Sequence, residues 1–225
     1  MKGNSLPAGL IFDMDGVLVD SNPFHLQKWV ALLDAHRIPY NPAELPKYVL
    51  GHRNDTAFRF FFGPQISEQE MQELSEELEE WFRRAFRPHA KPVPGLSALV
   101  EECHRAGIPM AVASSAMSKN VEFVVDALGF RKYFRSLLTG DEVTHPKPHP
   151  EIFLKTAEKL GLAPSSCVAF EDSFVGLESA KRAGMKCVAI ASTFPRDELE
   201  RHGQADLVAG SFEELSLESL RRLFL

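Results

Sequence analysis

Strand-like apolar segments alternate with amphipathic helical segments over most of this chain, and no other feature constrains its fold as strongly. The apolar segments lie at residues 9–13, 108–113, 136–139, 167–170, 186–191 and 206–208. Segments with apolar residues at helical spacing accompany them, at residues 95–106, 118–128, 149–160, 174–183 and 213–224. A strand–helix–strand order that repeats along a chain predicts a parallel sheet. We therefore expect an α/β fold built on a doubly wound parallel sheet.

The alternation stops between about residue 20 and residue 90, where the sequence indicates helices only. Helical segments are expected at residues 23–35, 42–48, 55–62 and 68–86. Ser67 and Glu70 form a capping-box pattern at the start of the last segment, and the prolines that follow it are typical of a stiff link. We expect an all-helical cap domain at 20–90, inserted into a core domain formed by 1–19 and 91–225. Because the insert follows the first strand directly, it is placed to cover the carboxyl edge of the sheet.

Two aspartates, Asp13 and Asp15, lie where the first apolar segment ends, and Gly16 follows them. Aspartate is disfavoured inside strands and glycine lets the chain leave the sheet sharply, so both side chains are expected at the crevice where open α/β sheets bind ligands. Two close carboxylates repel each other unless a cation or a shared proton relieves them. One carboxylate is then suited to bind metal and act as a nucleophile, while the other donates and accepts protons. Alternatively, the two aspartates could belong to a solvated turn or to part of a calcium-binding loop.

Two small hydroxyl residues, Ser114 and Ser115, follow the second apolar segment, and a helical segment begins at Ser118. A hydroxyl group and free main-chain amides at a helix entrance suit a phosphate oxygen. A simple helix cap with a turn accounts for the same residues. The residues themselves leave both interpretations open.

Prolines flank Lys147 on both sides, in a loop that follows the third apolar segment. Pro146 and Pro148 restrict the backbone on either side, so they direct the lysine side chain with little backbone entropy left to lose. A surface lysine has little need of such restraint. His145 and His149 lie in the same loop. We interpret both as structural, because a proline-rich turn is expected to hold them too far apart for a tetrahedral metal site.

A second acidic pair, Glu171 and Asp172, follows the fourth apolar segment and precedes Ser173, a residue suited to cap the next helix. Together with Asp13 and Asp15 this pair makes an oxygen-rich site suited to Mg²⁺, which binds carboxylates, waters and a substrate phosphate oxygen. A nucleophile, hydroxyl groups, a restrained lysine and magnesium ligands are the parts that phosphoryl transfer requires.

Composition argues against several other classes of protein. The net charge of −6 and the pI near 5.8 argue against binding to a nucleic-acid backbone. No apolar segment approaches membrane-spanning length, and the run before Asp13 is too short for a signal peptide, so we expect a cytoplasmic protein with no membrane partner. Cys103, Cys167 and Cys187 are odd in number and far apart, which favours reduced thiols in the core. We expect a monomer or a weak dimer, in which any basic residues gathered in a pocket would bind a small anion rather than nucleic acid.

These motifs together resemble those of the haloacid dehalogenase superfamily, specifically its β-phosphoglucomutase-like group of phosphatases and mutases. Four motifs match in order and span essentially the whole chain: Asp13-x-Asp15-Gly-Val-Leu-x-Asp20-Ser21, Ser114, Lys147-Pro148 and Glu171-Asp172-Ser173. The resemblance implies a Rossmann-like core with a helical cap inserted after the first motif, which agrees with the insert inferred above. Dehalogenation is not expected, because the dehalogenases do not use this magnesium site and lack the aspartate that stands here as Asp15.

The resemblance also implies roles for the motif residues. Asp13 would attack the phosphorus and form an aspartyl-phosphate, while Asp15 would protonate the leaving oxygen and then deprotonate the incoming water. Ser114 and Lys147 would hold the phosphoryl oxygens. The residues that would hold Mg²⁺ are Asp13, the main-chain carbonyl of Asp15, Asp172 and Glu171, the last as a ligand or as a partner of one.

The cap is expected to determine the substrate. The candidate substrate-binding residues are Ser114, Ser115 and Lys147 in the core, and His25, Trp29, Gly51 and Arg53 in the cap. His25 and Trp29 have the same offsets from the aspartate pair as a histidine and a tryptophan of β-phosphoglucomutases. Trp29 could instead be packed in the core of the cap. His25 could contact Asp15, or it could only lie at the edge of the crevice. The loop Leu50-Gly51-His52-Arg53 lacks the lysine that mutases have before the glycine, and its Gly-x-Arg form is associated with the family's phosphatases.

We therefore expect a Mg²⁺-dependent phosphatase that hydrolyses a small phosphorylated metabolite, of the sugar phosphate class, through an aspartyl-phosphate. An isomerase of the β-phosphoglucomutase type, with the same chemistry, is the alternative. It would have to hold a bisphosphate at two anion sites and exclude water. Arg53, Arg83 or Arg84 could supply the distal cation, although solvation at the surface accounts equally for the last two. A non-catalytic phosphometabolite-binding protein is disfavoured, because every catalytic position is filled.

Overall fold

Six parallel strands form the centre of the computed structural model, which describes residues 6–225. The strands are β1 (Gly9–Phe12), β2 (Met110–Ala113), β3 (Phe134–Leu138), β4 (Cys167–Glu171), β5 (Lys186–Ile190) and β6 (Leu207–Ala209). Their order in the sheet is β3-β2-β1-β4-β5-β6, and every neighbouring pair is parallel. The strand order reverses beside β1, which is where open α/β sheets bind ligands. The predicted doubly wound α/β fold is confirmed, and residues 1–5 of the predicted core lie outside the described residues.

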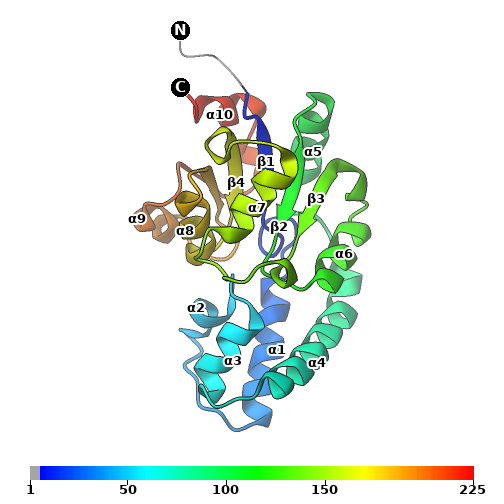
Figure 1. Cartoon of the computed structure of the whole chain (residues 1–225), viewed down its shortest axis with the longest axis vertical. Coiled ribbons are helices and arrows are strands. Elements are labelled where there is room, and N and C mark those ends of the chain that lie inside the picture. Colours follow the sequence, from blue (N-terminus) through cyan, green and yellow to red (C-terminus); the bar gives the residue numbers. More distant parts are fainter. Residues whose placement is uncertain (1–5) are drawn as a thin grey trace.

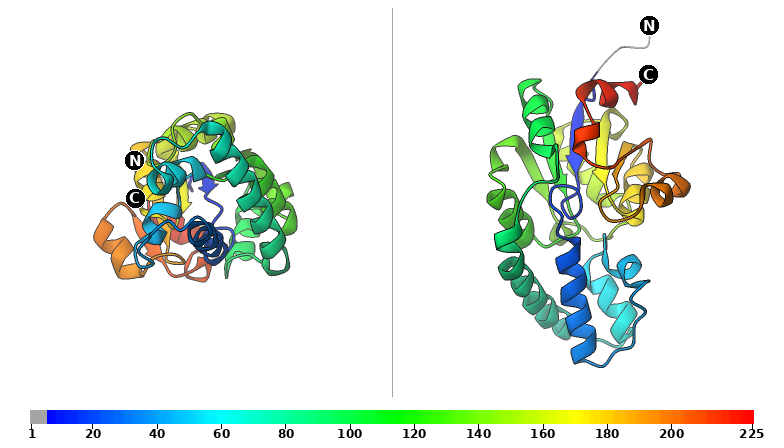
Figure 2. Two further views of the ribbon diagram at one scale, coloured as in Figure 1. Left: turned by 90° about the horizontal axis from the view of Figure 1, so that it is seen from below. Right: turned by 180° about the vertical axis from the view of Figure 1, so that it is seen from behind.

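Helices cover both faces of this sheet (Figures 1 and 2). They are α5 (Leu96–Arg105), α6 (Ser118–Ala127), α7 (Glu151–Leu160), α8 (Phe174–Arg182), α9 (Arg196–His202) and α10 (Leu217–Arg222). Side chains of β1 pack against the helix layers on both faces of the sheet. Leu10 and Phe12 pack in one apolar cluster with α5, α6 and α10, whereas Ile11 packs in a second cluster with α7 and α8. Because both faces of the strand are buried, β1 has the continuous apolar sequence typical of a central parallel strand.

Residues 22–86 form helices and no strand, as the sequence predicts. The helices are α1 (Asn22–Ala35), α2 (Leu45–Val49), α3 (Asn54–Phe62) and α4 (Glu68–Phe86). Figure 1 shows them together at one end of the sheet. Trp29 and Phe58 are part of a third apolar cluster that these helices share. The capping box of Ser67 and Glu70 at the start of α4 is also confirmed.

The structure differs from the sequence pattern near the carboxyl end. The pattern leaves residues 196–202 without a predicted helix, because Leu199 is the only apolar residue in α9. The segment 213–224, predicted as one helix, is a 3-10 turn followed by α10, because Ser216 caps a new helix together with Ser219. The 3-10 turns within the described residues are η1 (Arg87–His89), η2 (Arg131–Tyr133), η3 (Gly140–Glu142), η4 (Pro164–Ser166) and η5 (Phe212–Glu214).

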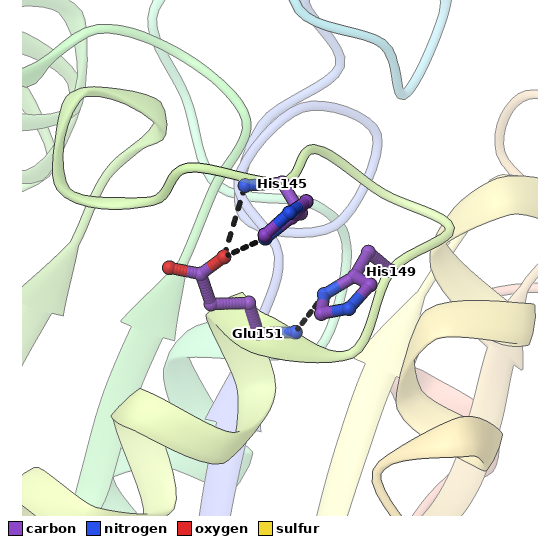
Figure 3. A group of neighbouring side chains, drawn as sticks. All are labelled: His145, His149 and Glu151. Carbon is purple, nitrogen blue, oxygen red and sulfur yellow. Dashed lines mark hydrogen bonds and ion pairs between the residues drawn. The ribbon is translucent and has the colours of Figure 1, made fainter.

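The loop that carries Lys147 is held by Glu151, the first residue of α7 (Figure 3). The Glu151 carboxylate accepts hydrogen bonds from the main-chain N–H groups of Thr144, at 3.1 Å, and His145, at 2.9 Å. The loop folds back on itself, and the rings of His145 and His149 have centroids only 4.5 Å apart. The interpretation that a proline-rich turn keeps these two histidines far apart is therefore wrong.

The three cysteines are buried and have free thiols, as predicted. Cys103 lies in the apolar cluster on one face of the sheet, and Cys167 and Cys187 lie in the cluster on the other face. Within residues 6–225, no helix combines the length and the apolar character that crossing a membrane requires.

Candidate active site

A pocket lies at the carboxyl edge of the sheet, between the strand ends and the helices α1–α4. Asp13 and Asp15 after β1, and Ser114 and Ser115 after β2, line it from the sheet side. The predicted residues that line it from the helical side are His25, Trp29, Gly51 and Arg53. The structure thus brings together residues that were predicted from separate motifs. The remaining predicted residues, Lys147, Glu171 and Asp172, lie behind Asp13 and are buried.

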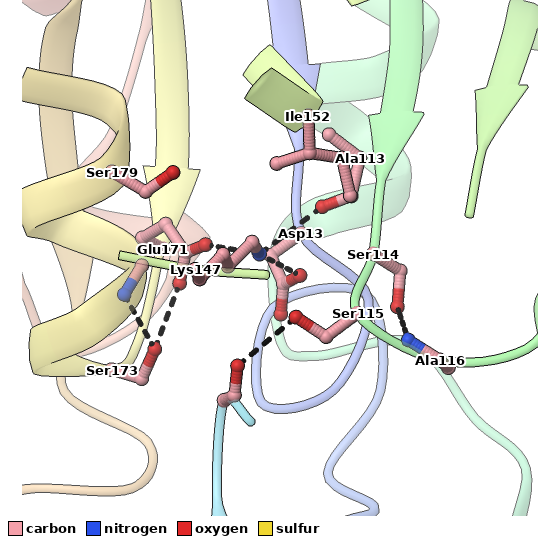
Figure 4. A network of polar contacts seen from close by, with 12 residues as sticks. Asp13, Ala113, Ser114, Ser115, Ala116, Lys147, Ile152, Glu171, Ser173 and Ser179 are labelled. Atoms are coloured by element: carbon pink, nitrogen blue, oxygen red, sulfur yellow. Dashed lines mark hydrogen bonds and ion pairs between the residues drawn. The ribbon is translucent and has the colours of Figure 1, made fainter. Parts of the chain in front are cut away.

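Lys147 links the first and fourth strand ends (Figure 4). Its ammonium group donates hydrogen bonds to Oδ1 of Asp13 at 2.7 Å, to Oε1 of Glu171 at 2.6 Å and to the main-chain carbonyl of Ala113 at 3.2 Å. Burial alone would lower the pKa of Lys147, but the charges of Asp13 and Glu171 outweigh burial and raise that pKa. The side chain therefore remains a cation beside the Asp13 carboxylate.

Asp13, Glu171 and Asp172 form a buried acidic cluster, in which one carboxylate oxygen from each lies within 4.8 Å of the others. Burial raises the pKa of Asp13, although the Lys147 ammonium opposes this effect. Burial and the charge of Glu171 together raise the pKa of Asp172 to about 8. Gly16 allows this close packing, because its φ is 78° and a Cβ there would overlap the Asp172 carboxylate.

The Asp15 carboxylate is not part of that cluster and has different partners. Its Oδ1 accepts a hydrogen bond from the hydroxyl of Ser21 at 2.5 Å and lies 2.9 Å from Nε2 of His25. Burial acts to raise the pKa of Asp15, but the charge of His25 and the hydrogen bonds from both neighbours hold it below its usual value. Of the two alternatives that the sequence leaves open for His25, the structure shows the contact with Asp15. The ring of His25 also stacks on Phe82 of α4, with centroids 4.3 Å apart.

Ser114 and Ser115 have different environments, although they are neighbours in sequence (Figure 4). The Ser114 hydroxyl accepts a hydrogen bond from the main-chain N–H of Ala116 at 3.1 Å, which leaves its own proton available to a ligand oxygen. The Ser115 hydroxyl donates to the main-chain carbonyl of Gly51 at 3.0 Å. Neither hydroxyl caps α6, because the N-cap residue of that helix is Met117.

Arg53 joins the helical insert to the sheet side. It pairs with Asp55 at 2.6 Å and donates to the main-chain carbonyls of Val143, at 3.1 Å, and Gly140, at 3.4 Å.

Trp29 lines the pocket but is only 1% exposed, and it packs against Phe58 with ring centroids 4.9 Å apart. Core packing, the alternative that the sequence offers for Trp29, therefore accounts for most of its surface.

Lys28 and Glu79 are among the pocket residues that the sequence patterns miss. Both are buried, and Nζ of Lys28 lies 2.5 Å from Oε1 of Glu79. The same carboxylate accepts hydrogen bonds from the side-chain amides of Asn54, at 2.7 Å, and Asn120, at 2.5 Å. Glu79 belongs to an acidic run at 73–80, and such a run on a helix predicts a solvated face. For Glu79 this prediction is wrong, because its side chain is buried. Its position next to the buried Leu78, on the apolar side of α4, is the signal that could have identified it.

The two arginines of α4 lie outside this pocket. Arg83 donates a hydrogen bond to the side-chain carbonyl of Asn120 at 2.6 Å, and neither Arg83 nor Arg84 is among the residues that line the pocket.

His52 lines the pocket, and Nδ1 of His52 is buried with no hydrogen-bond partner among the described residues. Burial lowers the pKa of His52, so this ring is neutral near pH 7.

Comparison with protein families and individual proteins adds to this geometry. A family model described as haloacid dehalogenase-like hydrolase matches residues 10–190. The chain is 31% identical over 216 residues to the chloroplastic 5-amino-6-(5-phospho-D-ribitylamino)uracil phosphatase of Arabidopsis thaliana; this match covers 96% of the chain but spans 57% of that protein's length.

Two further proteins match this chain over most of both lengths. The fructose-1-phosphate phosphatase YqaB of Escherichia coli (strain K12) is 32% identical over 183 residues, which are 81% of this chain and 96% of that protein. The crystal structure of a β-phosphoglucomutase from Clostridium difficile superimposes with a TM-score of 0.82 at 26% identity and covers 96% of each chain.

Proposed function

Because this chain belongs to the haloacid dehalogenase-like hydrolase family, we propose that it is a Mg²⁺-dependent phosphatase of small phosphorylated metabolites, of the sugar phosphate class. One observation carries the proposal. A buried lysine, Lys147, contacts the carboxylates of both Asp13 and Glu171 directly behind the pocket. A fixed cation beside a carboxylate nucleophile is what an anionic phosphoryl group requires. The relatives named as phosphatases support the same activity.

We assign the core domain to residues 1–19 and 91–225 and the cap domain to 20–90. The third apolar cluster supports this division, because all its buried members lie between Trp29 and Leu78. The phosphoryl chemistry belongs to the core in this division, and recognition of the rest of the substrate belongs to the cap.

Asp13 is the proposed nucleophile. In the first step an Asp13 carboxylate oxygen attacks phosphorus, the bond to the leaving oxygen breaks, and Asp15 donates a proton to that oxygen. In the second step a water attacks the phosphorus, Asp15 takes its proton, and the bond to Asp13 breaks to release inorganic phosphate. Lys147, at 2.7 Å from Asp13, offsets the negative charge of the nucleophile and the phosphoryl group. The Ser114 hydroxyl is available to donate to a phosphoryl oxygen.

His25 supports Asp15 in this scheme. The two side chains share a contact of 2.9 Å between Nε2 and Oδ1, so together they can hold the proton that the leaving oxygen needs. The charge and hydrogen bond of His25 hold the pKa of Asp15 below its usual value. An anionic phosphoryl group beside Asp15 opposes the ionised carboxylate and so raises the pKa of Asp15 toward the value that proton donation requires.

A divalent cation fits the buried acidic cluster. Three buried carboxyl groups, of Asp13, Glu171 and Asp172, face the single ammonium group of Lys147, so the cluster would carry excess negative charge if all three were ionised. The pKa of Asp172, raised to about 8, is typical of a carboxylate that a cation would stabilise. Carboxylate oxygens suit Mg²⁺, which when bound supplies further positive charge to the phosphoryl oxygens. We assign Asp13, Asp172, Glu171 and the main-chain carbonyl of Asp15 as the residues that would hold it.

The charges of the pocket favour a neutral, hydroxyl-rich leaving group. Lys28 is paired with Glu79, and Arg53 is paired with Asp55, so both cationic side chains are already neutralised. The unpartnered Nδ1 of His52 can exchange a hydrogen bond with a substrate hydroxyl. A second phosphate group would have to break one of the two ion pairs, which disfavours bisphosphates. This argument supports a phosphatase rather than a mutase.

A β-phosphoglucomutase-type isomerase is the second candidate. Two observations favour it: the contact of His25 with Asp15, at the offset that the mutases share, and the likeness to the Clostridium difficile enzyme. It would use the same aspartyl-phosphate, but a bound bisphosphate would return the phosphoryl group.

Two assays run side by side separate these candidates. The first measures phosphate release from a panel of sugar phosphates with Mg²⁺. The second measures conversion of β-glucose 1-phosphate to glucose 6-phosphate with a trace of the 1,6-bisphosphate. We expect phosphate release without isomerisation, and isomerisation that outpaces phosphate release would establish the mutase instead.

A further inference from the structure

The exposed side of the Lys147 loop brings two imidazoles and a carboxylate together, and we propose that His145, His149 and Glu151 bind a transition-metal ion of the Zn²⁺ class. Each residue offers one ligand atom, and these atoms lie within 4.8 Å of one another. Both histidines are exposed and Glu151 is partly buried, so an ion can enter from solvent (Figure 3). This group is distinct from the buried acidic cluster of the active site.

The contact between His145 and Glu151 has nearly the spacing of two ligands on one metal ion. Nδ1 of His145 lies 2.9 Å from Oε2 of Glu151. Two ligand atoms bound to a tetrahedral Zn²⁺ at about 2.0–2.2 Å lie about 3.3–3.6 Å from each other. A metal ion can therefore replace the proton between these two atoms with only a small shift of the side chains.

His149 supplies the third ligand. Its ring lies beside that of His145, with centroids 4.5 Å apart and planes inclined by 33°. Its Nδ1 accepts a long hydrogen bond of 3.3 Å from the main-chain N–H of Glu151, so the ring is held near the carboxylate. Three protein ligands leave a fourth position for water, as in other accessible zinc sites.

The surroundings of Glu151 orient its carboxylate for this role. The main-chain N–H groups of Thr144 and His145 donate to it, and Nζ of Lys155 lies 2.6 Å from Oε1. These contacts remain when a metal ion replaces only the Nδ1 proton of His145. Hydrogen bonds of this kind fix a ligand before the ion arrives. The loop itself is stiffened by three prolines: Pro146, Pro148 and Pro150.

The donor set selects the class of metal. Two imidazoles and one carboxylate suit Zn²⁺, Co²⁺ and Ni²⁺, whereas Mg²⁺ and Ca²⁺ prefer oxygen ligands alone. The cysteines, which would otherwise compete for Zn²⁺, are all buried in the apolar clusters. An ion at this site would tie together both ends of the loop that presents Lys147 to Asp13.

Titration calorimetry of the tag-free full chain with Zn²⁺, in an excess of Mg²⁺, tests the proposal. We expect one equivalent of Zn²⁺ to bind, and His145→Ala and His149→Ala each to weaken this binding by at least about tenfold. His104→Ala removes an exposed histidine on α5 and serves as the matched control, with unchanged Zn²⁺ binding. Co²⁺ added to the same samples reports the site independently, through visible absorption bands that both loop variants should lose.

Three results would overturn the proposal. The first is failure of the wild-type chain to bind Zn²⁺, and the second is unchanged binding by the His145→Ala/His149→Ala double variant. The third is Zn²⁺ binding that Asp172→Asn abolishes while the double variant retains it, because the ion would then occupy the acidic cluster. Circular dichroism checks that each variant is folded. The His145 and His149 variants are expected to fold, because both side chains are exposed. None of these measurements depends on phosphatase activity.

Discussion

Lys147 shows at the scale of single residues how the chain supports a buried charge. Its side chain is 1% exposed, and burying an ammonium group costs several kcal/mol unless opposite charges compensate it. Asp13 and Glu171 provide that compensation at 2.7 and 2.6 Å. The lysine in turn keeps these two carboxylates from repelling each other, so the stability of this region and the proposed chemistry depend on the same contacts.

Replacing Lys147 with methionine tests both roles. We expect Lys147→Met to lower kcat for phosphate release at least about 10²-fold, because the cation beside the phosphoryl group is lost. The free energy of unfolding of the metal-free protein should fall by about 3 kcal/mol, since two buried carboxylates lose their partner. Steady-state kinetics and urea denaturation measure the two effects. Lys159→Met, an exposed lysine on α7, is the control, and a kcat within twofold of wild type would contradict the role of Lys147.

Asp15 is the second residue whose role can be tested alone. We expect Asp15→Asn to lower kcat by about 10²–10⁴-fold with little change in KM, because the amide cannot transfer a proton in either step. Steady-state and single-turnover phosphate release separate the two steps. Asp126→Asn, at an exposed position on α6, controls for the loss of a charge. If only KM changed in Asp15→Asn, the acid–base assignment would be wrong.

Individual elements show why much of the fold and of the site could be predicted from the sequence. A parallel strand buried on both faces leaves a continuous apolar segment, and polar residues directly after it must lie at the carboxyl edge of the sheet. Asp13, Ser114 and Glu171 were recognisable for this reason. The loop with Lys147 was recognisable from its prolines. Helix α9 was not, because its one buried residue leaves no periodic pattern.

The cap-side residues were harder to predict, because their environment depends on packing between helices. Glu79 is separated from Lys28 by 51 residues and from Asn120 by 41, so no local pattern connects them. An acidic run on an amphipathic helix is typical of a solvated surface. Only the packing of α4 against α1 and α6 turns Glu79 inward. The register of helices against one another is the information that the sequence lacks.

A double-mutant cycle tests this connection between helices. Lys28→Met and Glu79→Leu should each lower the free energy of unfolding by about 3–5 kcal/mol, because each leaves a buried charge without its partner. The double variant should lose less than the sum, by about 1–3 kcal/mol, since it removes both charges. Urea denaturation of the four proteins measures the coupling. Additive effects, within about 0.5 kcal/mol, would show that the pair is not energetically connected.

At the scale of the whole molecule, the charged site lies between the carboxyl edge of the sheet and the helices α1–α4, so these helices can exclude water from one side of it. Residues at the carboxyl ends of β1 and β4 form the acidic cluster, and the loop before α7 contributes Lys147. The helices α1–α4 line the other side of the pocket. Arg53 and Ser115 form hydrogen bonds across the two sides, so the pocket in this structure is bounded by both. Separate parts of the chain thus supply the proposed chemistry and the recognition of the substrate.

Removal of metal should affect activity and stability together. We expect EDTA to abolish phosphate release and added Mg²⁺ to restore it, because the acidic cluster then regains its compensating charge. Mg²⁺ at about 100 times its dissociation constant should stabilise the folded protein by about 2.7 kcal/mol, which scanning calorimetry can detect as a rise in Tm. Asp172→Asn should lose this rise, whereas Asp126→Asn should keep it. Phosphate release that survives EDTA would remove the metal from the mechanism.

The central claim, that Asp13 is a nucleophile for phosphoryl transfer, is tested most directly by trapping the covalent intermediate. The protein is mixed with Mg²⁺ and a sugar phosphate that it hydrolyses, quenched in acid within the first turnover, digested and analysed by mass spectrometry. The account predicts one phosphoryl group on Asp13, and none in the Asp13→Asn variant, which should also release no phosphate. Phosphate release by Asp13→Asn at the wild-type rate, or a phosphoryl group on another residue, would contradict it.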